Sequence, residues 1–235
     1  MVTPSASRLP AHVWRAGQLA PPPGQVLASG HPALAAHLPG RGWPGRCLIE
    51  LLAAQPGQGE ATLLRPALAR LAGCGPIVLV QPPHPPMAQA WQQGWPTAAP
   101  FWWVQAAHAT DTLWAVHQAL RSGACAAILA WLPNAPELAL RRLHLAAQDT
   151  STLLVVVRPW HTQPRSSPAP LRLGLQPSPQ GLRVHFLKTR GLRPDHPILL
   201  PWPTAELVAS ATAPASPEPS DSNPAAVAAH TTSSC

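Results

Sequence analysis

Residues 47–64, CLIELLAAQPGQGEATLL, join an apolar run to an amphipathic segment through a short turn rich in glycine. This layout predicts a buried strand, a tight turn and the start of a helix, the arrangement of a phosphate-binding P-loop with the spacing G-x-x-x-x-G-K-[ST]. Glu60 stands at the lysine position and Ala61 at the hydroxyl position. The sequence therefore predicts a nucleotide-binding fold without the charge that would hold a phosphate.

Strand and helix patterns continue to alternate along the chain. Strands are predicted at 47–54, 77–80, 101–105, 126–131 and 152–158, and helices at 61–72, 88–93, 110–123 and 134–148. Pro66 falls inside the first helix, where it removes a backbone donor. Thr110 or Asp111 is expected to cap the third helix, and Asn134-x-x-Glu137 has the spacing of a capping box.

The last patterned segments, 171–176 and 182–188, predict an antiparallel pair joined by Pro-Ser-Pro-Gln-Gly. With the alternation before them, they predict an α/β fold: a mostly parallel sheet flanked by helices, with an antiparallel hairpin at the C-terminal edge. Residues 31–200 form the expected core domain.

The two ends differ from this core in composition. Residues 1–30 are rich in Pro and Ala and are expected to form an extended arm. Residues 201–235 have few large apolar side chains. Because burying them would not offset the entropy lost on ordering, we expect a disordered tail. The sequence contains no run of about 18 apolar residues, so we predict no membrane helix. The N-terminus also lacks the apolar segment of a secretory signal. The expected location is the cytoplasm.

Basic residues are concentrated late in the chain. The sequence has 16 Lys and Arg against nine Asp and Glu. Residues 158–193 carry no acid and contain Arg158, Arg165, Arg172, Arg183, Lys188, Arg190 and Arg193. Residues 195–235 carry acids and neither Lys nor Arg. Two interpretations remain open: a nucleic-acid face with an autoinhibitory tail, or a solvated surface followed by a disordered tail.

Metal-binding patterns are missing from the sequence. Cys47, Cys74, Cys125 and Cys235 lack C-x-x-C spacing, and the 11 histidines form neither H-E-x-x-H nor an i,i+4 pair. Cysteines in apolar stretches or at a terminus predict core thiols rather than metal ligands or disulfides. We expect no metal and no other cofactor.

Five segments, taken in order, resemble the RecA-fold core. More closely, they resemble the ImuA family of RecA-related accessory proteins of bacterial translesion synthesis, often labelled SulA-like. The segments are 13–19 (VWRAGQL), 38–71, 112–133, 140–159 and 171–191. Their order and spacing carry the resemblance, which covers most of residues 10–200. It implies a RecA-like fold for the core domain.

The resemblance also places the positions that RecA-type proteins use for ATP hydrolysis. The P-loop lysine falls on Glu60, the magnesium-binding hydroxyl near Ala61, and the acid that ends the Walker-B strand on Trp131. The water-activating glutamate falls in Gln81-Pro82-Pro83 and the polar nucleotide sensor near Arg158-Pro159. All five lack suitable side chains. The resemblance therefore implies no catalytic residue, and a degenerate loop made of Gln55, Gly57, Gly59, Glu60, Ala61 and Thr62.

The implied function is that of a non-catalytic adaptor in SOS-induced, mutagenic translesion DNA synthesis. Its implied partners are an ImuB-like polymerase homologue and an error-prone DnaE-type polymerase, with RecA and single-stranded DNA as further candidates. Arg183, Lys188 and Arg190 are the candidate contacts to a partner or to DNA. For Lys188 and Arg190 the alternative is charge that protects an exposed edge strand.

Other functions remain open at this point. Gly57, Gly59 and Thr62 would serve an atypical DNA-dependent ATPase, because loop amides alone can bind anions. A module for single-stranded DNA would use the 158–193 segment, with Trp160 and Phe186 stacking on bases. A SulA-type inhibitor of cell division is a more remote alternative.

Overall fold

The computed structural model describes residues 26–55, 57–92, 95, 99–191 and 193–202. Its elements are β1 Val26–Ala28, α1 Pro32–Ala35, η2 Pro39–Arg41, β2 Gly42–Pro44, β3 Leu48–Ala53, α2 Glu60–Leu71, β4 Ile77–Val80, α3 Ala88–Gln92, β5 Phe101–Val104, α4 Ala109–Ser122, β6 Ala127–Trp131, α5 Glu137–Gln148, β7 Leu153–Pro159, η3 Trp160–Thr162, β8 Leu171–Ser178, β9 Gly181–Lys188 and β10 Ile198–Pro201. The arm up to residue 25 and the tail from residue 203 lie outside these residues, so the expectations for them are not described further.

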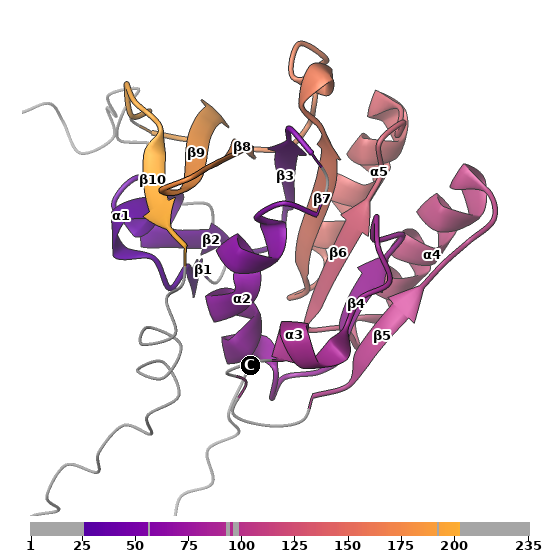
Figure 1. Ribbon diagram of the computed structural model, residues 1–235. Coiled ribbons are helices and arrows are strands. Elements are labelled where there is room, and N and C mark those ends of the chain that lie inside the picture. Colours follow the sequence, from indigo (N-terminus) through magenta and orange to yellow (C-terminus); the bar gives the residue numbers. More distant parts are fainter. Residues whose placement is uncertain (1–25, 56, 93–94, 96–98, 192, 203–235) are drawn as a thin grey trace, which may run out of the picture.

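An eight-stranded sheet in the order β10-β9-β8-β3-β7-β6-β4-β5 forms the centre of the molecule (Figure 1). Neighbouring strands from β8 to β5 all run parallel. Strands β8, β9 and β10 then pair antiparallel at the other edge. The predicted fold class is therefore confirmed. Strand β10 and the small β1–β2 sheet were not predicted from the sequence, and β1 lies within the range expected for the arm.

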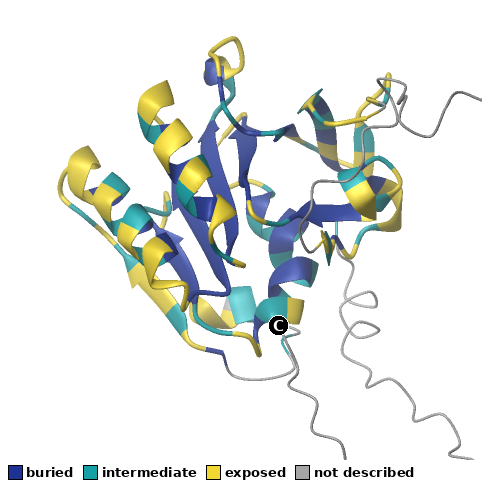
Figure 2. Cartoon of the chain, turned by 180° about the vertical axis from the view of Figure 1, so that it is seen from behind, coloured by how far each residue is buried: buried dark blue, intermediate teal, exposed yellow. Residues whose placement is uncertain are grey.

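Apolar side chains alternate between the two faces of the sheet and form two cores. Ile49 and Leu51 of β3 pack with α2 on one face, whereas Leu48 packs with α4 and α5 on the other. Figure 2 shows the buried sheet between helices whose outer faces are exposed. Strand β7 is buried along almost its whole length, because helices and loops cover both of its faces.

Helix ends only partly follow the predicted signals. Gly123 terminates α4 with a left-handed φ of 63°, as predicted. The expected caps Thr110 and Asp111 are wrong: His108 is the N-cap, and Thr112 Oγ1 donates to its carbonyl at 3.1 Å. The capping box at Asn134 is also wrong. Pro136 caps α5 without a side-chain bond, and Glu137 pairs instead with Arg141 at 3.1 Å.

Pro66 stays inside α2, as predicted. A proline there leaves the carbonyl one turn earlier without its helical donor. The ring of His31 lies at this point of the helix, with Nε2 3.1 Å from the carbonyl oxygen of Leu63. Gly30 packs directly on the Pro66 ring, since a Cβ added to it would lie 2.1 Å from the proline Cβ.

The cysteines divide into two kinds. Cys47 and Cys125 are buried free thiols, as predicted. Cys74 is exposed and disulfide-bonded, so the core-thiol prediction is wrong there. It lies in the turn after α2, outside the apolar core. Cys235 lies outside the described residues. Within the residues described, the longest apolar helices are too short to cross a membrane.

Candidate functional site

The degenerate phosphate loop joins β3 to α2 at the carboxyl edge of the parallel strands. Gly57 and Gly59 have φ angles of 86° and 114°, a conformation that favours glycine. A Cβ on Gly59 would lie 2.6 Å from Leu182 of β9, so the loop packs tightly against the hairpin. Gln55 is exposed at the start of the turn, and Ala61 and Thr62 are half-buried in the first turn of α2.

Glu60 folds back into this loop. Its side chain is 1% exposed, and Oε1 accepts a hydrogen bond from the N–H of Gly57 at 2.8 Å. In a P-loop such N–H groups hold a phosphate. Here the protein's own carboxyl group takes that place. Within the described residues, Oε2 has no hydrogen-bond partner.

Burial dominates the electrostatics of Glu60. It raises the pKa of the carboxyl group, and nearby donors only partly oppose it: the backbone N–H groups of Gly57, Glu60 and Gln58 and the indole of Trp131. The Trp131 N–H lies beside the carboxyl without reaching hydrogen-bond geometry to any described residue. The positions assigned to the P-loop lysine and to the Walker-B acid are therefore side by side.

The loop after β4 closes over the same region. Gln81 has a left-handed φ of 52°, and its Nε2 donates to the carbonyl of Ala106 at 2.6 Å. A Cβ on Gly57 would lie 3.2 Å from the ring of His84 and 3.4 Å from Pro83. The segment assigned to the water-activating glutamate thus rests on the phosphate loop, with prolines in place of a carboxylate.

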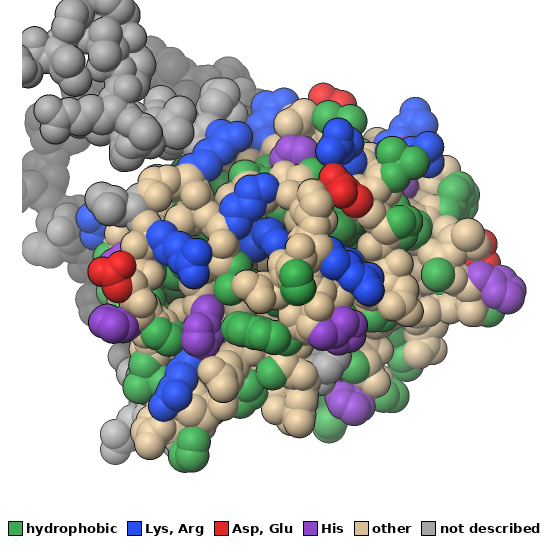
Figure 3. Space-filling model, turned by 90° about the horizontal axis from the view of Figure 1, so that it is seen from above, with side chains coloured by type: hydrophobic (Ala, Val, Ile, Leu, Met, Phe, Trp, Pro, Cys, Tyr) green, Lys and Arg blue, Asp and Glu red, His purple; other side chains and the backbone are tan. Residues whose placement is uncertain are grey.

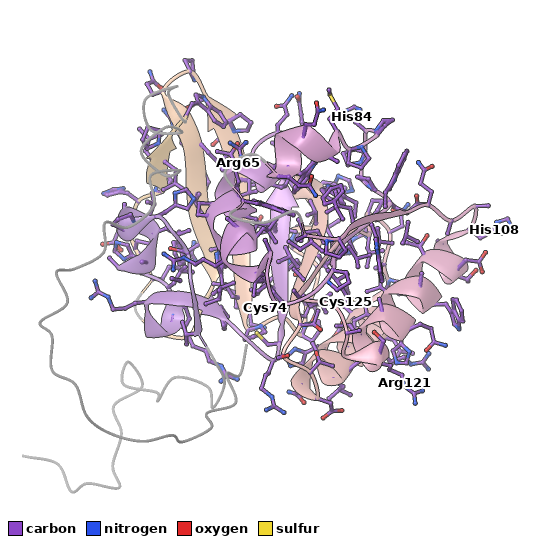
Figure 4. All side chains as sticks on the ribbon, turned by 90° about the horizontal axis from the view of Figure 1, so that it is seen from below. Arg65, Cys74, His84, His108, Arg121 and Cys125 are labelled. Atoms are coloured by element: carbon purple, nitrogen blue, oxygen red, sulfur yellow. The ribbon has the colours of Figure 1, made fainter. Side chains whose placement is uncertain are left out.

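A cavity of about 560 Å³ opens beside these positions. Its walls come from the ends of β4, β6 and β7 and from the start of α4, and they include Gln81, Pro83, His108, Thr110, Leu113, Trp131, Leu132, Pro133, Ala135, Arg158 and Pro159. Figure 4 shows His108 and Arg121 at opposite ends of α4. None of the described residues that line the cavity is Asp or Glu, so this wall lacks the carboxylates that a magnesium–nucleotide centre uses.

A buried ion cluster lies across β7, β3 and β8, and sequence reasoning missed it. Glu50 is fully buried, with Oε1 2.9 Å from Arg158 Nη1 and Oε2 2.7 Å from Arg172 Nε. Arg158 also donates to the Ala135 carbonyl, and Arg172 to the Gln163 carbonyl. A single acid within the apolar run of β3 was the available signal. Arg158, at the sensor position, is therefore engaged with Glu50.

The predicted basic contacts do not form one cluster. Arg183 lies near the start of β9 and Lys188 at its end, with Arg190 just beyond. Lys188 Nζ donates to the Ser167 carbonyl at 3.0 Å. Strand β10 pairs with β9 only over residues 181–184, so it does not cover the end of the strand that carries Lys188, and the edge-strand alternative for Lys188 and Arg190 stays a prediction. Lys and Arg side chains also predominate over Asp and Glu on the face seen from above in Figure 3.

The two predicted aromatic stackers have different surroundings. Phe186 is 3% exposed in the core, with its ring centroid 6.2 Å from that of His37, so the stacking prediction is wrong for it. Trp160 is half-buried over Gly174, and its ring meets His185 edge-on at 5.4 Å. In the part of the chain that the structure describes, no group of three or more His, Cys, Asp or Glu side chains is placed to hold a metal.

Comparisons with known proteins give little beyond this geometry. No protein-family model matches the chain, and no curated protein matches it. Among solved structures, SulA from Pseudomonas aeruginosa is 22% identical with a TM-score of 0.36. The match covers 47% of this chain and 97% of that chain. A likeness at this score carries no argument about function.

Proposed function

We propose that this chain is a non-catalytic, RecA-like accessory protein that acts as an adaptor in mutagenic translesion DNA synthesis during the SOS response. One observation carries the non-catalytic part: the buried carboxyl group of Glu60 accepts the Gly57 N–H inside the phosphate loop. A triphosphate would have to displace this group, and the loop offers no lysine to receive it.

The surroundings of the loop support the same conclusion. Catalysis of phosphoryl transfer depends on cations and magnesium-binding acids around the phosphates. Trp131, Pro83 and Pro159 hold positions that the resemblance assigns to such groups, and the described residues of the cavity that they border include neither Asp nor Glu. Arg158 lines this cavity, and its guanidinium is paired with Glu50 at 2.9 Å rather than directed at a phosphate. This geometry fits a protein that keeps a RecA-like shape for binding rather than for turnover.

The partners follow from the resemblance of residues 10–200 to the ImuA family. The proposed partners are an ImuB-like polymerase homologue and an error-prone DnaE-type polymerase, with RecA as the third. All three would recognise the folded surface without a nucleotide cycle. Association with them is therefore expected to be the same with and without ATP.

Purified tagged protein should be tested for capture of each partner from the same organism, with and without ATP. We expect capture of the ImuB-like protein that ATP does not alter. The variant Arg121→Ala, changed at the exposed end of α4 away from the cavity, is tested beside wild type as a control for protein handling and folding. Capture of none of the three partners would overturn the adaptor proposal, and capture that requires ATP would overturn its non-catalytic part.

A further inference from the structure

A second cavity, of about 480 Å³, lies where the parallel strands begin, at the opposite end of the strands from the phosphate loop. It is bordered by the start of β3, the start of β8, the end of α5 and the segment just after β9. Arg46, His144, Gln148 and Arg190 are its polar and charged side chains. Among the described residues, neither Asp nor Glu lines it.

Arg46 is held in place at the rim. Its backbone has a left-handed φ of 54°, and its Nε donates to the Gln148 carbonyl at 2.7 Å. That carbonyl belongs to the C-terminal end of α5, whose dipole alone would oppose a bound anion. The guanidinium satisfies this carbonyl and places a full positive charge next to it. Within the described residues, only Nε of Arg46 is engaged in a hydrogen bond.

His144 is held between the backbone of Leu48 and the side chain of Gln148. Its Nδ1 accepts a hydrogen bond from the Leu48 N–H at 3.2 Å, so the neutral ring carries its proton on Nε2. Burial lowers the pKa of His144, and the charges of Arg190 and Lys188 lower it further. Arg190 lines the same cavity as His144. Nε2 of the ring lies 3.4 Å from Gln148 Nε2, so both ring nitrogens are engaged within the described residues.

Arg190 is the second guanidinium group in the cavity wall. Its guanidinium is exposed, and it forms no hydrogen bond or ion pair with another described residue. Asp149 follows Gln148 in sequence but does not line the cavity. Pro44, Pro170 and Leu171 provide an apolar wall beside the charges.

We propose that this cavity binds a phosphate ester, with the guanidinium groups of Arg46 and Arg190 on the phosphate oxygens and the paired side chains of His144 and Gln148 in the wall beside them. Arginine guanidinium groups match phosphate geometry and form strong, charge-assisted hydrogen bonds. The apolar wall fits the sugar or base next to such a phosphate. The site gives Arg190 a defined class of ligand. It does not depend on the adaptor proposal, because the two cavities lie at opposite ends of the parallel strands.

Three probes identify the source of the phosphate: inorganic phosphate, a thymidine mononucleotide and a fluorescein-labelled oligothymidylate. Calorimetry measures the first two, and fluorescence anisotropy at several salt concentrations measures the third. We expect Arg190→Gln to weaken binding about tenfold or more, as the loss of a charged hydrogen bond does. For the oligonucleotide, the slope of log binding constant against log salt concentration should also become shallower by about 1, since one fewer counterion is released.

Arg121→Gln is the matched control, since it removes the same charge from an exposed residue at the end of α4 that does not line this cavity. Arg46→Gln should act like Arg190→Gln, and the urea transition of each variant confirms folding. Binding of phosphate or mononucleotide that Arg190→Gln weakens supports a small phosphate ester. Binding of the oligonucleotide alone, weakened in the same way, supports a nucleic-acid backbone. Binding of no probe, or equal weakening by Arg121→Gln and Arg190→Gln, would overturn the proposal.

Discussion

Glu60 Oε1 lies 2.8 Å from the backbone nitrogen of Gly57 and accepts its hydrogen, inside a turn shaped like a phosphate loop. The carboxyl group supplies from within the chain an acceptor that a nucleotide would otherwise bring. It also explains why this loop keeps its shape without the usual lysine. The buried position of Glu60 has consequences that can be measured.

The first consequence concerns pH. Because the pKa of Glu60 is raised above its ordinary value of 4.5, the folded protein binds more protons here than the unfolded chain. The free energy of unfolding should therefore fall as pH rises from about 4.5 through the raised pKa. In Glu60→Gln this contribution disappears. Urea unfolding of both proteins across that range should show wild type losing stability relative to the variant as pH rises, and parallel curves would contradict the assignment.

The buried cluster gives a second prediction. Glu50→Ala would leave the guanidinium groups of Arg158 and Arg172 buried without their carboxylate. Breaking a buried ion pair in this way costs about 3–5 kcal/mol. Glu137→Ala, which removes an exposed pair with Arg141, should cost less than about 1 kcal/mol. Urea unfolding compares the two variants, and similar losses would show that the cluster does not stabilise the fold.

A third prediction tests how closely Trp160 packs on β8. A Cβ added to Gly174 would lie 2.3 Å from the Trp160 ring, so the ring would have to move. Overpacking of this kind costs about 1–3 kcal/mol. Gly73→Ala is the control, because a Cβ there meets nothing within 4 Å. If Gly174→Ala unfolds at the same urea concentration as Gly73→Ala, Trp160 does not pack on β8 as described.

A fourth prediction concerns His144. Its pKa is lowered by burial and by the charges of Arg190 and Lys188, so the unfolded chain binds a proton more readily than the folded one. The contribution of His144 to the free energy of unfolding should therefore be lost as the pH falls from 6.5 through the lowered pKa. His144→Asn removes the titration. The free energy of unfolding of wild type, relative to this variant, should fall between pH 7.5 and about 5, and a constant difference would refute the assignment.

The sequence was most informative where a pattern is local. Apolar runs located the parallel strands, and Gly123 located the end of α4. Strand β10 was missed because Ile198–Pro201 is short and is stabilised by pairing with β9. The Glu50 cluster was missed for a related reason: Arg172 lies 122 positions away in sequence. The cavity around Arg46 and Arg190 likewise exists only once β3, α5 and β9 are brought together.

Nucleotide binding and turnover test the non-catalytic proposal most directly. ATP binding should be measured by calorimetry, and ATP hydrolysis at steady state with single-stranded DNA, using RecA from the same organism as the positive control. Because Glu60 occupies the Gly57 amide, we predict no heat of ATP binding at the loop and no hydrolysis above background. ATP turnover that is lost in Glu60→Ala or Thr62→Ala would contradict this account.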